Sequence, residues 1–245
     1  MRVTAIIPAR DEEACIGAVV AAVRAVAGGP VIVVDNGSSD GTSVAARAAG
    51  AEVVAEPVAG YGRACMAGVR AAGEVDVLLF LDGDGSDRAE DIAGLLAAIE
   101  AGADLALAVR RGAGVESGSI APAAKFGNWL SGGLIGLLWG RRLHDLSPLK
   151  AVRREALLSL GEGEQTYGWT VELLARSAAR GLTIVECSAG YRRRAGGTSK
   201  VSGNLRASAV AGYRILRTIA VVARTEGIRG PGASRRRGID RARRT

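Results

Sequence analysis

Two kinds of apolar pattern alternate along the first half of the chain. Five short runs are apolar almost throughout and rich in Val, Ile or Leu, which is typical of strands buried on both faces. These runs are residues 3–9, 30–35, 51–56, 75–82 and 103–110. The segments between them begin with acidic or capping residues and end at or just before glycine, as helices do. These predicted helices are residues 11–26, 38–50, 60–73 and 89–102. Strands joined by helices form βαβ units, so the pattern predicts an α/β fold with a mostly parallel sheet and helices on both faces.

The second half of the chain has a less regular pattern. We expect a strand-like segment at 143–154, helices at 154–161 and 170–181, a strand at 182–191, and a final amphipathic helix from Val201 to about Arg224. The uncharged run Phe126–Gly140 has 15 residues, fewer than the ~20 that a membrane-spanning helix needs. It fits either a helix packed on the sheet or a surface that meets lipid.

Charge is concentrated at one end of the chain. From Ile228 onward there are seven arginines and one aspartate, a net of +6 out of the +7 of the whole chain. We therefore expect one domain over residues 1–227 and a disordered basic tail over residues 228–245. Such a tail fits an anionic membrane surface or nucleic acid, and equally a simple solvated terminus.

Cysteine and histidine are too few to suggest a zinc site. The three cysteines are far apart and His144 is the one histidine, which favours a reducing, cytosolic compartment. The first residues, "MRVTAIIPARDEE", turn acidic where a signal peptide would still be apolar, so we expect no export signal.

Polar residues follow three of the predicted strands directly. They are Pro8–Glu12, Asp35–Ser38 and Asp82–Asp87. In open parallel sheets the ligand binds at the carboxyl ends of the strands, so we expect these groups to meet at a binding site. The first group, "PARDEE", lacks the glycines of a dinucleotide site, and its carboxylates would repel a pyrophosphate.

The segment "FLDGDGSD" gives this edge its chemistry. Two carboxylates on a tight turn can bind one divalent cation, which can then hold a diphosphate and stabilise the charge on a leaving group. Gly83 and Gly85 would let the backbone turn and the ligand approach closely. The alternative is an ordinary Asp-Gly turn. With either interpretation we expect Asp87 to cap the following helix. For the same reason we expect Asp40 to cap the helix that follows it.

Six motifs occur in an order that resembles family 2 glycosyltransferases with the GT-A fold. They are "AIIPARDEE", "VIVVDNGSSDGT", "GYGRA", "FLDGDGSD", "DLSPLKAVRREAL" and "RAGGTSK", and the likeness runs from about Val3 to Ile219. The branch it resembles most is that of the dolichol-phosphate mannose and glucose synthases and their bacterial relatives. The resemblance implies a sugar-nucleotide donor, GDP- or UDP-linked, and Mg²⁺ or Mn²⁺ as cofactor.

The resemblance also implies the residues of the donor site. The donor-binding positions are Pro8, Ala9, Arg10, Glu12, Asp35, Gly60, Gly62, Arg63, Asp82, Gly83 and Asp84. Asp82 and Asp84 match the family's metal-binding motif and are also assigned to catalysis. Ser86 stands where the branch has a further polar metal ligand, often Gln.

The resemblance places acceptor or phosphate contacts in the second half of the chain. The matching positions are Arg141, Asp145, Ser147, Lys150, Arg194 and Lys200. For Arg141, a solvated charge at a helix end is an equal alternative. Glu172 is the one candidate for a catalytic base, and it is equally a partner for Arg176 one helical turn later.

Together these features predict a metal-dependent inverting glycosyltransferase whose acceptor is a polyprenyl phosphate at a membrane surface. A phosphate nucleophile has a second pKa of ~6 and needs no strong base. We expect a cytoplasmic protein that is peripheral on the inner face of the cell membrane, with no nucleic-acid partner. Two alternatives remain at this point: a sugar nucleotidyltransferase, and a non-catalytic protein that binds nucleic acid or membrane through its tail.

Overall fold

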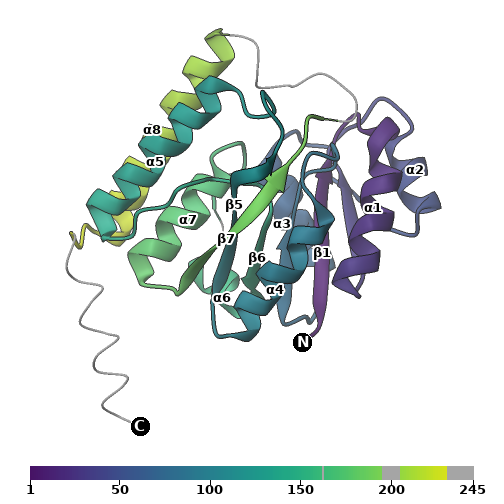
Figure 1. The fold of residues 1–245 in the computed structure, drawn as a ribbon, viewed down its shortest axis with the longest axis horizontal. Helices are drawn as coiled ribbons and strands as arrows, with labels where there is room; N and C mark the ends of the chain where they lie inside the picture. Colours follow the sequence, from purple (N-terminus) through teal and green to yellow (C-terminus); the bar gives the residue numbers. More distant parts are fainter. Residues whose placement is uncertain (162, 195–204, 231–245) are drawn as a thin grey trace.

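The computed structural model describes residues 1–161, 163–194 and 205–230. Within these residues the chain forms a seven-stranded sheet in the order β3-β2-β1-β4-β6-β5-β7. Figure 1 labels four of the strands, β1, β5, β6 and β7. The strands are β1 Val3–Ala9, β2 Val31–Asp35, β3 Glu52–Ala55, β4 Val77–Phe80, β5 Leu105–Val115, β6 Lys150–Arg153 and β7 Ile184–Tyr191. Strand β6 runs antiparallel to both of its neighbours, and the other pairings are parallel. The prediction of a mostly parallel α/β sheet is confirmed.

Helices cover both faces of the sheet. They are α1 Glu13–Ala27, α2 Thr42–Ala48, α3 Tyr61–Ala71, α4 Ile92–Glu100, α5 Pro122–Trp139, α6 Arg154–Leu160, α7 Trp169–Arg180 and α8 Leu205–Glu226, with a 3₁₀ turn, η1, at Ala89–Asp91. Alternate strand residues feed two separate cores: Ile6 packs with residues of α3 and α7, whereas Ile7 packs with residues of α1 and α4. This alternation is why each of the central strands reads as continuously apolar in the sequence.

Strand β6 is the feature that the βαβ pattern did not predict. The strand-like segment 143–154 yields only four strand residues, which insert between β4 and β5. The preceding residues, 143–149, form a loop whose odd-numbered side chains are buried. This loop therefore has the period-two burial of a strand without strand pairing, although two of its buried side chains, Asp145 and Ser147, are polar.

Helices α5 and α8 lie side by side along one flank of the molecule (Figure 1). Their carboxyl ends are joined, because the indole nitrogen Nε1 of Trp139 donates a 2.8 Å hydrogen bond to the carbonyl of Gly227. The backbone of α5 also packs closely on the loop before β6, since a Cβ on Gly132 would lie 1.9 Å from the carbonyl oxygen of Leu143. In the described part of the chain, no helix has both the length and the apolar character required to cross a membrane.

Candidate functional site

The carboxyl ends of β1, β2 and β4 lie next to one another at one edge of the sheet. Ala9 of β1 pairs with Asp35 of β2, and Ile6 of β1 pairs with Phe80 of β4. The three polar groups that the sequence places after these strands therefore share this edge, as predicted. We call it the ligand edge.

Asp84 is a buried carboxylate of the ligand edge whose position is fixed by hydrogen bonds. It is 1% exposed, and its Oδ1 accepts hydrogen bonds from the backbone N–H and the hydroxyl of Ser86, at 2.9 and 2.5 Å. Its Oδ2 is buried and accepts no hydrogen bond from any described residue. The charge facing Oδ2 is the Arg194 guanidinium, whose Nε lies 2.7 Å away without hydrogen-bond alignment. A buried carboxylate oxygen that has a cation beside it but no hydrogen bond fits a divalent cation.

The hydrogen bonds of Ser86 favour a different role from the metal ligand that the resemblance implies. Its side chain is fully buried, and its hydroxyl is committed to Asp84. The geometry therefore favours Ser86 as a residue that orients Asp84. In addition, no group of three His, Cys, Asp or Glu side chains in the described ranges is arranged to hold a metal ion alone. A cation at Asp84 would thus need ligands from a bound diphosphate or from water.

Asp82 and Asp87 crowd the same turn. Burial and the Asp84 carboxylate raise the pKa of Asp82 to about 6. Burial and the Asp82 carboxylate raise the pKa of Asp87 to about 8. The expectation that Asp87 caps the next helix is wrong: its carboxylate accepts a 3.3 Å hydrogen bond from the backbone N–H of Asp82, and the turn η1 has no side-chain cap. Asp87 closes the turn on itself, and a bound cation would relieve the repulsion between these carboxylates.

The loops after β1 and β2 are fastened to each other. Asp40 accepts hydrogen bonds from the backbone N–H groups of Thr42 and Glu13, the first residues of α2 and α1. The N-cap position of α2 is Gly41, so Asp40 satisfies the first N–H of that helix from one residue before the predicted place. Asp35 accepts bonds from the Ser38 backbone and the Ser43 hydroxyl. Burial alone would raise the pKa of Asp35, but these hydrogen bonds hold it below its usual value. Both loops are thus fixed before any ligand binds.

The donor-binding positions on these loops differ in exposure. Pro8 and Ala9 are buried, so they can offer backbone rather than side chains, whereas Arg10 is exposed beside the site. Glu12 donates its backbone N–H to the Thr42 hydroxyl, and its Oε1 lies 3.8 Å from the Arg194 guanidinium. Gly83 is buried within the turn.

Gly60 and Gly62 pack against protein. A Cβ on Gly60 would lie 2.4 Å from the carbonyl oxygen of Gln165, and one on Gly62 would lie 2.2 Å from that of Glu164. The N–H groups of Gly62 and Arg63 donate to the carbonyls of Thr166 and Gln165. These first N–H groups of α3 are therefore satisfied by the loop before α7. The two glycines permit this close approach, and the Arg63 side chain is the partly exposed group of the motif.

Arg110, in the middle of β5, is a candidate that sequence reasoning missed. Its Nε and NH2 donate to the two oxygens of Asp145 at 2.9 and 2.7 Å, and its guanidinium stacks 4.8 Å from the ring centre of Tyr191. Asn128 donates to the same carboxylate. Burial alone would lower the pKa of Arg110, but the bonds to Asp145 raise it, so its charge is fixed. The available signal was position: Arg110 is the first charge after an apolar strand.

Asp145 and Ser147 organise the loop before β6. Both are buried, and the Ser147 hydroxyl accepts a 3.3 Å bond from the backbone of Leu149. Asp145 can reach a phosphate only through Arg110, because both of its oxygens are already used and a carboxylate would repel the anion.

Lys150 lies beneath the site. It is 0% exposed, and its Nζ donates to the carbonyl of Pro148 at 2.8 Å and lies 5.5 Å from the ring centre of Trp169. Burial lowers its pKa to about 8. Asp82 is among the nearby negative groups that oppose this shift. Lys150 therefore supplies positive charge from below the acidic turn, and its burial separates it from solvent and from a surface ligand.

Two further predicted site residues do not present their side chains at the ligand edge: Glu172 is buried, and Arg141 lies at the opposite edge of the sheet. Glu172 is 6% exposed, and its oxygens are held by the Arg176 guanidinium at 2.8 Å and by the backbone N–H of Glu164. This geometry favours the helix ion pair over a catalytic base.

Arg141 donates to the carbonyl of Ile184, at the amino end of β7. Since β7 runs parallel to β5, the Arg141 guanidinium belongs to the opposite edge, and the placement corrects its assignment to acceptor phosphate. Lys200 lies outside the described residues.

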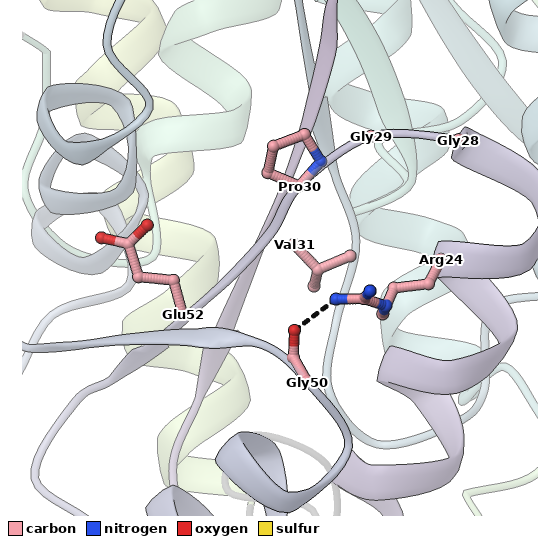
Figure 2. Close-up of a pocket in the computed structure, with 7 residues that line it drawn as sticks. All are labelled: Arg24, Gly28, Gly29, Pro30, Val31, Gly50 and Glu52. Atoms are coloured by element: carbon pink, nitrogen blue, oxygen red, sulfur yellow. Dashed lines mark hydrogen bonds between the residues drawn. The ribbon is translucent and has the colours of Figure 1, made fainter.

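A hollow of about 540 Å³ also lies at the opposite edge of the sheet (Figure 2). It is lined by Arg24, Gly28, Gly29, Pro30, Val31, Gly50 and Glu52. The Arg24 guanidinium donates to the carbonyl of Gly50 (Figure 2). Val31 is the first residue of β2, so the hollow is separated from the acidic turn by the length of the sheet.

Comparison with known proteins agrees with this arrangement. The family model described as "Glycosyl transferase family 2" matches residues 4–161. An uncharacterized glycosyltransferase of Mycobacterium tuberculosis is 41% identical over 216 residues, which cover 85% of this chain and 94% of that protein. The undecaprenyl-phosphate mannosyltransferase of Micrococcus luteus is 32% identical over 228 residues, 86% of this chain and 91% of that protein.

A solved structure shares the fold over most of its length. It is glucosyl-3-phosphoglycerate synthase from Mycobacterium tuberculosis in complex with Mn²⁺, UDP-glucose and phosphoglyceric acid. It is 26% identical to this chain, with a TM-score of 0.74, and the match covers 94% of this chain and 82% of that one.

Proposed function

Because the chain belongs to glycosyl transferase family 2, in the branch of the dolichol-phosphate sugar synthases, we propose that it moves a sugar from a nucleotide donor to a polyprenyl phosphate. The protein is a glycosyltransferase with the GT-A fold. Family membership decides against the nucleotidyltransferase and the non-catalytic alternatives. The donor class, the metal and the acceptor are the proposed part.

The single observation that carries the proposal is the state of Asp84. One of its oxygens is fixed by Ser86, and the other is buried, has no hydrogen bond and faces the Arg194 guanidinium at the ligand edge. A Mg²⁺ or Mn²⁺ ion held there, with Asp82 nearby, would neutralise the diphosphate of a GDP- or UDP-sugar as it leaves. A solved relative binds Mn²⁺ together with UDP-glucose, which supports this assignment.

The chain's own residues would prepare the two reacting groups. The fastened loops after β1 and β2 would orient the nucleoside through Asp35 and the backbone of Pro8 and Ala9. Arg110, in the middle of β5 and fixed by Asp145, offers a permanent positive charge that would act on the acceptor phosphate. The acceptor oxygen would attack the anomeric carbon from the face opposite the diphosphate, which inverts the configuration.

A phosphate acceptor also explains why the described residues of the site include no evident base. The carboxylate first assigned to that role, Glu172, is buried and paired with Arg176. A phosphomonoester is largely ionised at neutral pH, because its second pKa is ~6, so it can attack without losing a proton to the enzyme.

The flank formed by α5 and α8 supports a lipid-linked acceptor. Phe126 and Trp129 on α5 are 62% and 59% exposed, with their rings 5.9 Å apart. On α8, three exposed arginines stand near exposed apolar side chains; the arginines are Arg214, Arg217 and Arg224. Aromatic side chains with nearby cations are typical of helices that lie in the interface of an anionic membrane. We therefore propose peripheral attachment to the inner face of the cell membrane.

Transfer assays with single substitutions test the function. GDP- and UDP-sugars would be supplied with Mn²⁺ and a short polyprenyl phosphate, and D84N and D82N would be compared with the unmodified enzyme. We expect D84N to lose at least ~100-fold in kcat, since a group that stabilises the leaving charge is removed. Full activity in both variants would disprove the proposed site.

The acceptor class is tested in the same assay. Phosphoglyceric acid, which the solved relative binds, serves as the soluble comparison acceptor. Transfer to it, with none to the polyprenyl phosphate, would contradict the lipid assignment while leaving the donor site intact.

A further inference from the structure

Arg194 stands where a cation would have to approach Asp84. It follows β7 by three residues, and the end of β7 is fixed to the acidic turn because the Arg192 backbone donates a 2.9 Å bond to the carbonyl of Ser86. From there the Arg194 guanidinium reaches two carboxylates. Its Nε lies 2.7 Å from Asp84 Oδ2, and its NH1 lies 3.8 Å from Glu12 Oε1.

The Arg194 guanidinium and a metal ion cannot both bind Asp84, because only one of its oxygens can take a positive charge. Oδ1 is already used twice by Ser86, so Oδ2 is the oxygen that can take a positive charge. A carboxylate that is 1% exposed cannot be satisfied by bulk water, and leaving it unpaired is costly. A guanidinium 2.7 Å away and a divalent ion on the same oxygen would repel each other strongly.

We propose that Arg194 is the resident counter-ion of the metal position: it holds Asp84 Oδ2 in the ligand-free protein and leaves when a divalent cation takes that oxygen. The inference rests on the proposed function, because it concerns the metal of that same site. A diphosphate arriving with the metal gives the displaced guanidinium a new anionic partner. Metal and donor therefore bind together more favourably than the metal does alone, which is a positive coupling between the two ligands.

Binding of Mn²⁺ to the protein without nucleotide tests the inference directly. Free Mn²⁺ is measured from its electron paramagnetic resonance signal as the protein is titrated. R194Q removes the counter-ion and keeps a polar side chain of similar shape. R192Q is the matched control, because it removes the same charge two residues away, from an exposed pair with Glu90. The double variant D84N/R194Q removes the oxygen as well.

We expect R194Q to bind Mn²⁺ about tenfold more tightly than the unmodified protein, as the loss of a competing ion contact to a buried carboxylate predicts. R192Q should bind like the unmodified protein, and D84N/R194Q should lose the gain. Equal binding by R194Q and the unmodified protein, including no measurable binding by either, would overturn the inference.

A second measurement tests the proposed function separately from the counter-ion inference. Binding of UDP and GDP is measured by calorimetry with and without Mn²⁺. If nucleotide binding depends on Mn²⁺ and is lost in D84N while R194Q leaves the affinity for Mn²⁺ alone unchanged, only the counter-ion inference fails. If nucleotide binding is the same in D84N, the metal site itself fails.

Discussion

Asp84 and Asp145 are two buried carboxylates that the chain uses in different ways. Asp84 has one oxygen fixed by Ser86 and presents the other to an ion. Asp145 has both oxygens occupied, by Arg110, Asn128 and the backbone of Leu146. The first arrangement is that of a ligand residue and the second is that of a positioning residue. Their partners therefore predict different consequences of substitution.

Replacing Ser86 with alanine should weaken metal-dependent nucleotide binding while the fold is kept. The variant removes the 2.5 Å bond to Asp84 Oδ1, so the carboxylate can rotate away from the position it holds. A hydrogen bond to a charged group contributes about 1.5–3 kcal/mol, which predicts a loss of about tenfold or more in affinity for UDP or GDP with Mn²⁺. Calorimetry measures it. S159A is the control, because the Ser159 hydroxyl bonds within α6; an equal loss in both variants would contradict the role of Ser86.

Replacing Asp145 with asparagine should destabilise the whole fold. Arg110 would lose its partner while its guanidinium stays buried against Tyr191. Breaking a buried ion pair from one side costs about 3–5 kcal/mol, which denaturant unfolding would detect as a lower midpoint. The exposed pair of Arg2 and Asp76 provides the comparison, and D76N should change stability little. A midpoint for D145N equal to that of D76N would refute the prediction.

Lys150 should give stability a specific dependence on pH. Burial lowers its pKa from 10.5 to about 8, so between these values the unfolded chain binds more protons than the folded one. Its contribution to stability therefore rises with pH across this window, by about 2–3 kcal/mol in total. K150M removes the group, so its stability relative to the unmodified protein should fall from pH 8 to 10.5. If the difference in stability between K150M and the unmodified protein did not change with pH, the pKa of Lys150 would not be lowered in the folded protein.

At the scale of elements, the sequence predicted the strands and helices that have a local apolar pattern. It missed the features that depend on contacts between residues far apart in the chain. The apolar strands and the helices between them follow from local pattern, and so does the meeting of three polar groups at one edge. The insertion of β6 between β4 and β5 depends on long-range pairing that no local pattern encodes. The same is true of Gly62, which the motif assigns to the donor and the structure packs against the loop before α7.

Helix α5 has one side in the core and one side exposed, so its structure is compatible with both alternatives that its composition left open. Ile135 and Trp139 face the core, whereas Phe126, Trp129 and Leu137 are exposed. An uncharged sequence conceals this division, since glycines and apolar residues occur on both sides. The exposed side is the one available to lipid.

Removing the exposed aromatics of α5 should weaken membrane binding without affecting the site. F126A/W129A is expected to lower the affinity for vesicles that contain anionic lipid by about tenfold or more, because two large apolar side chains no longer enter the interface. Sedimentation with vesicles measures it. L158A is the matched control, since Leu158 is an exposed apolar residue on α6. Unchanged binding by F126A/W129A would contradict the proposed orientation of α5.

At the scale of the whole molecule, charge and chemistry are separated along the chain. The acidic turn, the fastened loops and Arg110 all lie within the α/β domain, whereas nearly all of the net charge follows Ile228. The last described residues are attached to the domain, because Arg229 and Gly230 both donate backbone bonds to the carbonyl of Leu138 in α5. The basic tail therefore leaves the domain beside the carboxyl end of α5, on the flank that we propose contacts the membrane.

Truncation after Gly230 should separate attachment from catalysis. It removes six arginines and one aspartate while keeping the bonds to α5. Each arginine near an anionic surface contributes about 1 kcal/mol, and salt screens this attraction, so the truncated protein should bind anionic vesicles more weakly and with a smaller salt dependence. Transfer from the donor to a short, water-soluble polyprenyl phosphate should keep its kcat, because the ligand edge is intact. Loss of turnover on the soluble acceptor would place the tail in the catalytic reaction, and unchanged vesicle binding would remove it from attachment.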